Sequence, residues 1–295
     1  MATIRNPIEV SGDWLARMGA WLGQSARVAR GDALPGDHAR LDTRVITIAD
    51  LRAALSAGAD DVMAFRSDVV ALCLVYPLVG AALAAVAFNQ ALLPMLFPLA
   101  SGFALLGPFF AVGLYELSRR REKGLENGWA HVFDVMASPS FGAILALGLG
   151  LIVLFTLWLV VAHILYALTL GPEMPISMTA LLSDVVTSPD GWALALAGGA
   201  TGFVFALVAL MASAVSFPLL LDRPTGLRAA VGTSLHLFRR NPGVMLVWGA
   251  IVAGCLVVAS LPAFLGLIFV MPLLGHATWH LYRRAVVVPG ADLPN

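Results

Sequence analysis

Residues 241–282 read NPGVMLVWGAIVAGCLVVASLPAFLGLIFVMPLLGHATWHLY and contain no Asp, Glu, Lys or Arg. A membrane-spanning helix needs about 20 predominantly apolar residues, so this stretch is long enough for two. The sequence Ser-Leu-Pro at 260–262 interrupts it near the middle. We therefore expect one helix over 243–260 and another over 262–282, which together form a transmembrane hairpin.

Three further stretches also lack these charged residues, at 69–115, 135–172 and 191–221. The first is long enough for two helices that break near Asn89 and Gln90, and the other two hold one helix each. The chain is therefore predicted to be all-α, a polytopic bundle of six membrane-spanning helices. The four helices that precede the hairpin are expected at 69–88, 91–115, 141–168 and 192–217.

The composition agrees with a membrane protein. Apolar residues make up 59% of the chain and charged residues 12%, whereas soluble domains are about half apolar and about a quarter charged. The mean hydropathy is +0.86 and the formal net charge is zero. These values exclude a nucleic-acid-binding protein with a basic face, a disordered tail protein and an ordinary cytosolic enzyme. The two cysteines, Cys73 and Cys255, are too few for a disulfide framework or a zinc site.

The positions of the basic residues predict the orientation. Six alternating helices place four segments on one side: those before 69, at 116–140, at 222–242 and after 282. These segments hold all 18 Lys and Arg residues. The loops on the opposite side, of which 171–190 is the longest, hold none. Because Lys and Arg accumulate in cytoplasmic loops, we expect both termini in the cytoplasm.

Each predicted hairpin follows an amphipathic segment with helical spacing, at 51–65, 129–136 and 227–238. Asp50 is expected to cap the first of these. The membrane domain is thus interpreted as three units, each a cytoplasmic interfacial helix followed by a transmembrane hairpin. Shared strings such as Leu-Arg-Ala-Ala favour duplication of one unit, and the alternative is that short apolar hairpins resemble one another by composition.

These elements divide the chain into three regions. A polar cytoplasmic segment over 1–45 carries a candidate interfacial helix at 12–22, where apolar residues recur at helical spacing. The six-helix membrane domain spans 46–285, and a cytoplasmic tail covers 286–295.

Small residues recur every three or four positions on several predicted spans. Such positions let helix backbones approach each other closely. The pattern predicts helix-packing faces, either inside the bundle or between subunits. These faces are marked by Gly142, Gly150, Gly198, Gly202 and Gly249.

Three histidines lie within predicted spans: His163, and the pair His276 and His280, which are four residues apart and share a helix face. Ligation of a metal or a haem is one interpretation of the pair. However, the pair has no carboxylate or thiol partner within any predicted span, and His163 lies at a different depth. We favour a packing or interfacial role. We predict no metal and no cofactor, with His276 and His280 as the candidates if a cofactor binds.

A basic cluster directly follows the second predicted span and comprises Arg119, Arg120, Arg121 and Lys123. It is a candidate site for anionic lipid headgroups, and the alternative is an ordinary orientation signal. The sequence contains no Gly-rich phosphate loop, nucleophile elbow, zinc-protease helix or pair of catalytic carboxylates. We therefore predict that the protein is not an enzyme.

Five strings carry a family resemblance: FPLASGFALLGP at 97–108, GLYELSRRR at 113–121, SPSFG at 138–142, SFPLLLDR at 216–223 and LGHATWHLYRR at 274–284. Together they resemble a proteobacterial family of predicted integral membrane proteins that is known only as a domain of unknown function. The resemblance covers about residues 45–285. It implies a location in the bacterial inner membrane and this arrangement of hairpins, and it carries over no activity, substrate or catalytic residue.

Two functions follow from these observations. The first is a non-catalytic accessory, assembly or scaffold subunit that docks on a larger inner-membrane complex. Its partners are membrane lipids and other membrane subunits, and not nucleic acid. The alternative is a permease-like transporter of a neutral or lipidic substrate. That alternative predicts a polar cavity lined by Thr156, Thr201, Ser213 and Thr278.

Overall fold

The computed structural model describes residues 41–64, 78, 80–81, 90–126, 128–171, 175–262 and 264–287. The predicted interfacial helix at 12–22, most of the predicted span at 69–88 and the tail beyond 287 lie outside these residues. The described part is helical, and its only bridge between extended segments is an isolated antiparallel one between Thr43 and Val286. The all-α prediction is confirmed.

The helices follow one another in the order that the hydropathy predicts, and two of them, η1 and η2, are 3₁₀ helices. Their bounds are α2 Ile48–Ala64, η1 Gln90–Met95, α5 Leu96–Ala100, α6 Gly102–Phe110, α7 Val112–Glu122, η2 Trp129–Ala137, α8 Phe141–Thr169, α9 Met178–Thr187, α10 Pro189–Ser213, α11 Ser216–Asp222, α12 Leu227–Arg240, α13 Pro242–Ser260 and α14 Leu267–Ala285.

Three segments of the described chain are long and apolar enough to cross a membrane: α8, Pro189–Asp222 and α13. There are four if Leu93–Ala100 and Ala104–Phe110, which meet at an angle of 45°, form one bent crossing. The bounds of α8 and α13 agree with the predicted spans to within one residue at each end. The total of six spans stays a prediction.

The predicted span at 91–115 is divided into η1, α5, α6 and α7, with Pro94 inside η1 and Pro108 inside α6. Proline removes a backbone donor and crowds the preceding turn, so it bends or interrupts a helix. The last predicted span also begins later than expected, at Leu267, because the preceding residues form turns and Phe264 has a positive φ of 64°.

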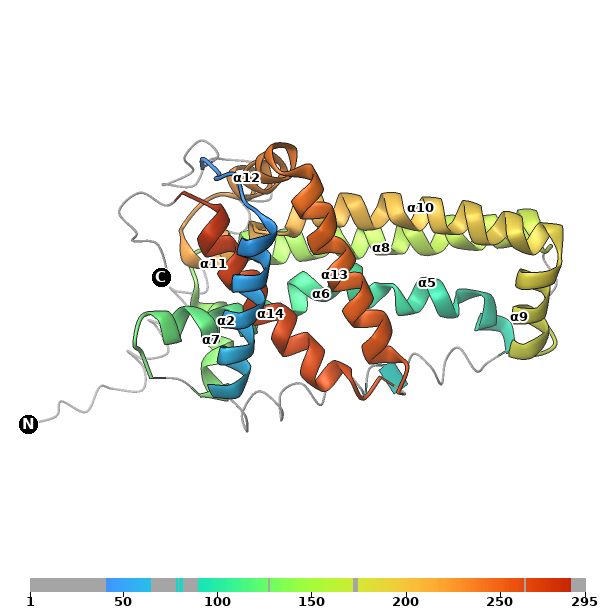
Figure 1. The fold of residues 1–295 in the computed structure, drawn as a ribbon, viewed down its shortest axis with the longest axis horizontal. Helices are drawn as coiled ribbons and strands as arrows, with labels where there is room; N and C mark the ends of the chain where they lie inside the picture. The colour runs from blue at the N-terminus through green and yellow to red at the C-terminus, as the bar shows by residue number, and fades with distance from the viewer. Residues whose placement is uncertain are drawn as a thin grey trace, which may run out of the picture.

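The long helices α8 and α10 pack side by side, and α9 lies across the ends that they share (Figure 1). The loop predicted at 171–190 therefore contains a helix of its own. Ser177 caps α9 by accepting the N–H of Ala180 at 3.1 Å, and Ser188 caps α10 by accepting the N–H of Gly191 at 2.9 Å.

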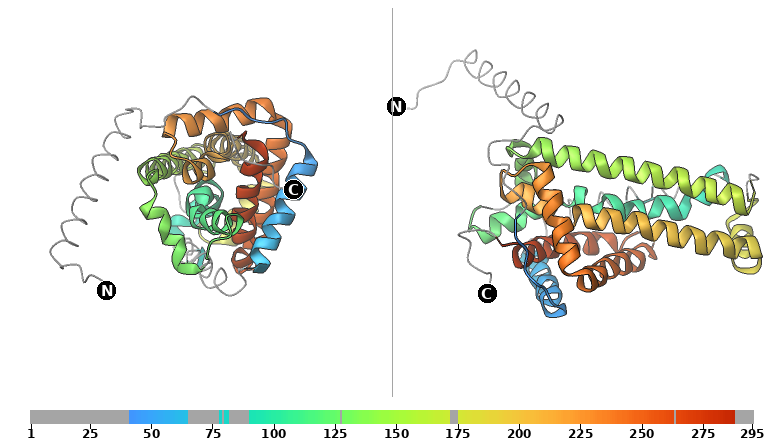
Figure 2. Two further views of the ribbon diagram at one scale, coloured as in Figure 1. Left: turned by 90° about the vertical axis from the view of Figure 1, so that its left-hand side faces the viewer. Right: turned by 90° about the horizontal axis from the view of Figure 1, so that it is seen from above.

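The first lead helix, α2, packs along α14 at the end of the molecule opposite α9 (Figures 1 and 2). Its buried face comprises Leu51, Ala54, Gly58 and Asp61. Gly58 is needed for this close approach, because a Cβ there would lie only 2.6 Å from the backbone nitrogen of Ala277. The face that we expected to meet the membrane surface is thus buried against another helix of the same chain.

The start of α2 is fixed by a reciprocal cap rather than by Asp50 alone. Thr47 precedes the helix, and the Asp50 carboxylate accepts both its N–H and its hydroxyl at 2.8 Å. The N–H of Asp50 in turn donates to the Thr47 hydroxyl oxygen at 3.4 Å. This arrangement is a capping box, in which Thr47 is the cap and Asp50 its partner three residues on.

The third lead helix, α12, is also packed against the bundle, where it contacts α10 and α11. Its buried residues are Ala229, Ala230, Thr233, Ser234 and Leu237. The middle lead segment forms η2, which contacts α7. All three predicted lead segments are therefore helical, and α2 and α12 bury one face inside the molecule.

The predicted glycine faces are only partly covered. A Cβ added to Gly202 would lie 3.2 Å from the Trp158 ring, and one added to Gly249 would lie 2.9 Å from Leu210. These two glycines therefore pack inside the bundle. A Cβ on Gly150 or on Gly198 would meet no atom within 4 Å, so these two lie on open surface.

On α8 the glycine that packs is Gly148, two residues before Gly150. A Cβ at Gly148 would overlap the ring of Phe109 from α6. Gly142, at the start of α8, is half-buried. The predicted face of α8 is therefore rotated towards Gly148, because a three-or-four-residue spacing does not determine which glycine of a Gly-rich helix meets its neighbour.

The contact at Gly58 yields a test of the α2–α14 packing. Gly58→Ala should lower the stability of the protein by about 1–3 kcal/mol, because the added methyl group overlaps the backbone of Ala277. Thermal unfolding in a mild detergent measures the effect. Gly150→Ala is the matched control, and equal melting temperatures for the two variants would contradict the packing described here.

Candidate functional site

The last helix, α14, presents two different faces to its neighbours. Met271, Leu274, Gly275 and Thr278 line an apolar cavity on one side. His276 and His280 contact Asp61 of α2 on another. This helix thus separates a polar cluster from an apolar cavity, and both are candidate functional sites.

The polar cluster joins α2, α7 and α14 around the carboxylate of Asp61, whose side chain is only 5% exposed. Ser118 of α7 donates its hydroxyl to Asp61 at 2.5 Å, and His280 Nε2 lies 2.9 Å from the same oxygen. Arg121 forms an ion pair with the other carboxylate oxygen. His276 Nδ1 lies 2.7 Å from the Ser118 hydroxyl oxygen.

The donors in this cluster can be assigned from its geometry. Because Ser118 gives its single proton to Asp61, its oxygen must accept a proton from Nδ1 of His276. The carboxylate can only accept, so Nε2 of His280 donates to it. A chain of hydrogen bonds thus runs from His276 through Ser118 to Asp61, and it fixes the orientation of both imidazole rings.

This environment changes the acidity of Asp61. Burial by itself would raise the pKa of the Asp61 carboxyl, but the hydrogen bonds from His280 and Ser118 and the nearby histidines outweigh it. Together they lower the pKa from 3.8 to about 2. Asp61 is therefore a stable anion at neutral pH.

The partner of the histidine pair lies outside the predicted spans, where the sequence analysis did not look for one. His276 and His280 do have a carboxylate partner, which comes from a lead helix and not from any predicted span. Within the described residues, no group of three or more His, Cys, Asp or Glu side chains is arranged to hold a metal ion. His163 is exposed on α8, a helix that contributes no residue to this cluster.

The basic cluster at the end of α7 takes part in ion pairs inside the chain, and its role as a lipid-headgroup site stays a prediction. Arg119 binds Glu116 through two hydrogen bonds of 2.7 and 2.8 Å, and Arg120 pairs with Asp134 at 2.9 Å. Arg121 pairs with Asp61, and Lys123 lies 3.7 Å from Asp222. These cations join α7 to α2, η2 and α11.

Two more acidic groups complete this ionic layer. Glu122 of α7 accepts hydrogen bonds from Trp279 at 3.0 Å and from Arg283 at 2.8 Å, both on α14. Asp222, at the end of α11, accepts the hydroxyl of Tyr282 at 2.9 Å. The ends of α7, α11 and α14 are thereby held together on the side of the molecule that carries the basic residues.

Three of the strings that carry the family resemblance meet at a second, polar pocket of about 310 Å³. GLYELSRRR contributes Glu116 and Arg119, SPSFG contributes Ser138 to Ser140, and SFPLLLDR contributes Leu221 to Arg223. The acidic and basic groups in this pocket pair with one another. Residues from three of these strings thus form one ionic junction between helices.

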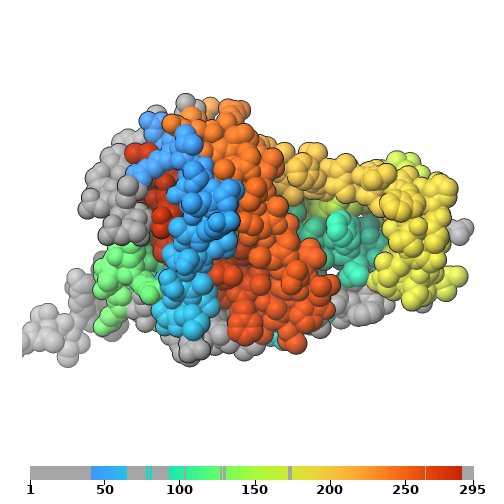
Figure 3. Space-filling view, viewed as in Figure 1, coloured from blue at the N-terminus to red at the C-terminus, as the bar shows by residue number. Residues whose placement is uncertain are grey.

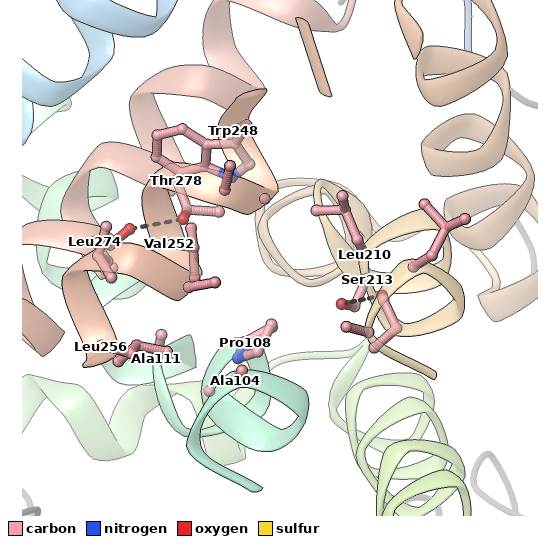
Figure 4. Close-up of a pocket in the computed structure, with 18 of the residues that line it drawn as sticks. Ala104, Pro108, Ala111, Leu210, Ser213, Trp248, Val252, Leu256, Leu274 and Thr278 are labelled. Carbon is pink, nitrogen blue, oxygen red and sulfur yellow. Dashed lines mark hydrogen bonds between the residues drawn. The ribbon is translucent and has the colours of Figure 1, made fainter. Parts of the chain in front are cut away.

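An apolar cavity of about 450 Å³ lies between α6, α10, α13 and α14 (Figure 4). Trp248, Leu210 and Pro108 point into it from three different helices. Of the hydroxyl-bearing residues that line it, Ser213 donates to the carbonyl of Ala209 and Thr278 to that of Leu274, each at 2.6 Å, and the third, Tyr115, is buried. The cavity therefore offers almost no free hydrogen-bonding group to a ligand.

The exposed residues among those that line the cavity show where it opens. They are Phe203 and Ala206 on α10, and Leu246, Ala250 and Ala253 on α13. The lining residues of α6 and α14 are buried or half-buried. The mouth thus lies between α10 and α13, and the space-filling view shows a hollow on this side of α13 (Figure 3).

Three acidic residues of the ion pairs described above were not identified from the sequence. Asp61, Glu122 and Asp222 were not singled out, because each lies outside the predicted spans. One signal was present: Asp61 continues the apolar stripe of Leu51, Ala54 and Gly58 on α2. An acidic residue on an otherwise apolar helix face indicates a buried partner.

The lowered pKa of Asp61 predicts how stability depends on pH. The folded-state value of about 2 is below the ordinary 3.8, so ionised Asp61 stabilises the folded protein above pH 4. This stabilisation is lost as the pH falls towards 2, and it amounts to about 2 kcal/mol. Thermal unfolding in detergent should show a drop over this range that Asp61→Asn abolishes. Asp60→Asn, at the exposed neighbouring position, should keep the drop, and the same pH profile in both variants would contradict this role.

Comparisons with known proteins give one match. Neither the curated proteins nor the solved structures contain a match to this chain. Residues 96–222 match a family model described as "Predicted integral membrane protein (DUF2189)". This segment runs from α5 to the end of α11 and includes three of the five helices that the ion pairs join, namely α7, η2 and α11. The resemblance to a family of integral membrane proteins of unknown function is thus confirmed over residues 96–222.

Proposed function

We propose that this membrane protein binds a lipidic molecule in the cavity between α6, α10, α13 and α14, and that it holds or moves this molecule without covalent chemistry. The cavity itself carries the proposal. Its volume of about 450 Å³ lies within the range of about 300–1,000 Å³ that is typical of ligand sites. Its mouth lies between α10 and α13, two helices that are long and apolar enough to cross a membrane.

The chemistry of the walls favours a lipidic substrate over a polar one. The permease interpretation expected four hydroxyl groups to line a polar cavity. Only Ser213 and Thr278 line it, and both donate to carbonyls of their own helices. Thr156 is exposed on α8 and bonds the carbonyl of Ile152, and Thr201 is not among the lining residues. A polar substrate would lose its hydration here without compensation.

The geometry of the polar cluster supports a non-catalytic role. In a hydrolytic triad the histidine accepts the serine proton and the carboxylate orients the histidine. Here Ser118 donates directly to Asp61 and is only 1% exposed, so its hydroxyl is neither activated nor accessible. The arrangement serves to hold α2, α7 and α14 together.

The distribution of charge supports a location in the bacterial inner membrane with both termini in the cytoplasm. All 18 Lys and Arg residues lie in the terminal segments or in the loops on one side of the predicted spans. The ionic layer that joins α7, α11 and α14 lies at this basic end. The outward faces of α8 and α10 carry exposed apolar residues such as Val153, Val160 and Leu196, which suit contact with lipid.

An accessory or scaffold role is the second candidate, and the uncovered glycines favour it. Gly150 on α8 and Gly198 on α10 lie on open surface, where a helix of another membrane protein can approach closely. If this role is correct, the protein should co-migrate with a larger complex after extraction in mild detergent. Gly198→Leu should release it, whereas Gly254→Leu, at an open position of α13, should not. Migration alone as a monomer or homo-oligomer would contradict this candidate.

The lipid-binding proposal is tested by measuring what the purified protein retains. We expect native mass spectrometry in mild detergent to find one lipidic molecule per chain. Ala253→Trp should abolish its retention, because Ala253 lines the mouth and an indole there fills the entrance.

Gly254→Trp is the matched control. It lies one residue further along α13, and a Cβ there would meet no atom within 4 Å. This variant should retain the lipid as the wild type does. A wild-type protein that carries no lipid, or equal retention by both tryptophan variants, would overturn the proposal.

A further inference from the structure

We infer that the lipid in this cavity is an anionic phospholipid from the leaflet at the basic end of the bundle, and that Arg239 and Arg240 bind its headgroup. This inference rests on the proposed function and specifies the ligand of the same site. Three observations support it. They are the position of the cavity along the spans, the lack of ion pairs at Arg239 and Arg240, and the structure of the corner between α12 and α13.

The lining of the cavity reaches towards the basic end on α10, and on α13 it runs from Leu246 to Leu256 through the middle of the helix. On α10 it is lined by residues from Phe203 to Ser213, which is the half that leads into α11. On α13 its lining begins at Leu246, soon after the helix starts at Pro242. A chain that enters between α10 and α13 therefore comes from the leaflet that contacts this end.

Several of the cations near this end are paired with carboxylates of the same chain. Arg119, Arg120, Arg121, Lys123 and Arg283 all take part in ion pairs. Arg239 and Arg240 are exposed, and in the described part of the chain neither forms an ion pair with a carboxylate. They therefore supply positive charge that an external anion can meet.

The corner that carries this arginine pair is held rigidly. Asn241 is buried and lies directly between α12 and α13. Its side chain accepts the N–H of Ile46 at 2.9 Å and donates to the carbonyls of Arg44 at 2.9 Å and Leu237 at 3.2 Å. Leu246, at the rim of the mouth, follows the start of α13 at Pro242 by four residues, which is roughly 6 Å along the helix. This spacing suits a headgroup at the corner and an acyl chain in the cavity.

A phospholipid satisfies both halves of this arrangement. Exposed Arg residues at a membrane surface attract anionic headgroups, and the apolar cavity requires a hydrocarbon chain. A free phosphate ion meets only the first condition, and an uncharged or zwitterionic lipid gains less from the arginine pair.

The test measures headgroup preference in the full-length protein. Purified protein is equilibrated with equal amounts of phosphatidylglycerol and phosphatidylcholine that carry identical acyl chains, and bound lipid is quantified by native mass spectrometry. We expect the wild type to prefer phosphatidylglycerol by roughly tenfold, as two arginines near the headgroup imply. The double variant Arg239→Gln/Arg240→Gln should still retain lipid but without preference. The control Arg52→Gln/Arg228→Gln, at exposed positions near the starts of α2 and α12, should keep the preference.

The outcomes separate the two proposals. Lipid retention without headgroup preference in the wild type, or a preference that survives in Arg239→Gln/Arg240→Gln, would overturn this inference and leave the lipid-binding function standing. Absence of lipid from the wild type would overturn both. Displacement of the lipid by millimolar inorganic phosphate would also overturn the inference, because it would indicate a site for free anions. Matching melting temperatures for the two double variants exclude a loss of folding as the cause.

Discussion

A single buried carboxylate ties together three helices that are distant in the sequence. Asp61 on α2 accepts hydrogen bonds from Ser118 on α7 and from His280 on α14, and it also pairs with Arg121. A charge buried without partners is very unfavourable, so α2 can occupy its position only if α7 and α14 supply these donors. The polar face of α14 is consequently committed to α2, and its opposite face is left to line the cavity.

The ionic layer explains what the basic residues gathered at one end of the protein do. Carboxylates at this end such as Asp61 and Glu122 pair with basic residues of neighbouring helices and so fix the positions of these helices relative to one another. At this end α7, α11 and α14 are held together. Beyond the corner at Asn241, α13 diverges from α10. The cavity is the space left by this divergence, and small residues along α13 such as Gly249 and Ala253 keep it open.

Hydropathy predicted the long helices well, and it failed where tertiary contacts or proline decide the structure. The bounds of α8 and α13 follow from their uninterrupted apolar stretches, while the span expected at 91–115 is divided because Pro94 and Pro108 lie within it. The histidine pair was correctly placed on one face of a helix, but its partner Asp61 was not predicted. A hydrogen bond between residues 219 positions apart leaves no periodic trace in the sequence. For the same reason the choice of Gly148 rather than Gly150 as the packing glycine was not predictable.

The separation of Asp61 and His280 along the sequence also has a consequence for biosynthesis. α2 is synthesised early, but His280 follows Asp61 of this helix by 219 residues. At translation rates of about 5–20 residues per second, roughly 10–40 s pass before the last helix is complete. During this time the carboxylate of α2 still lacks its histidine partners. Docking of α2 is therefore a closing step, and a chain that stops before α14 leaves its first described helix without the surface against which it folds.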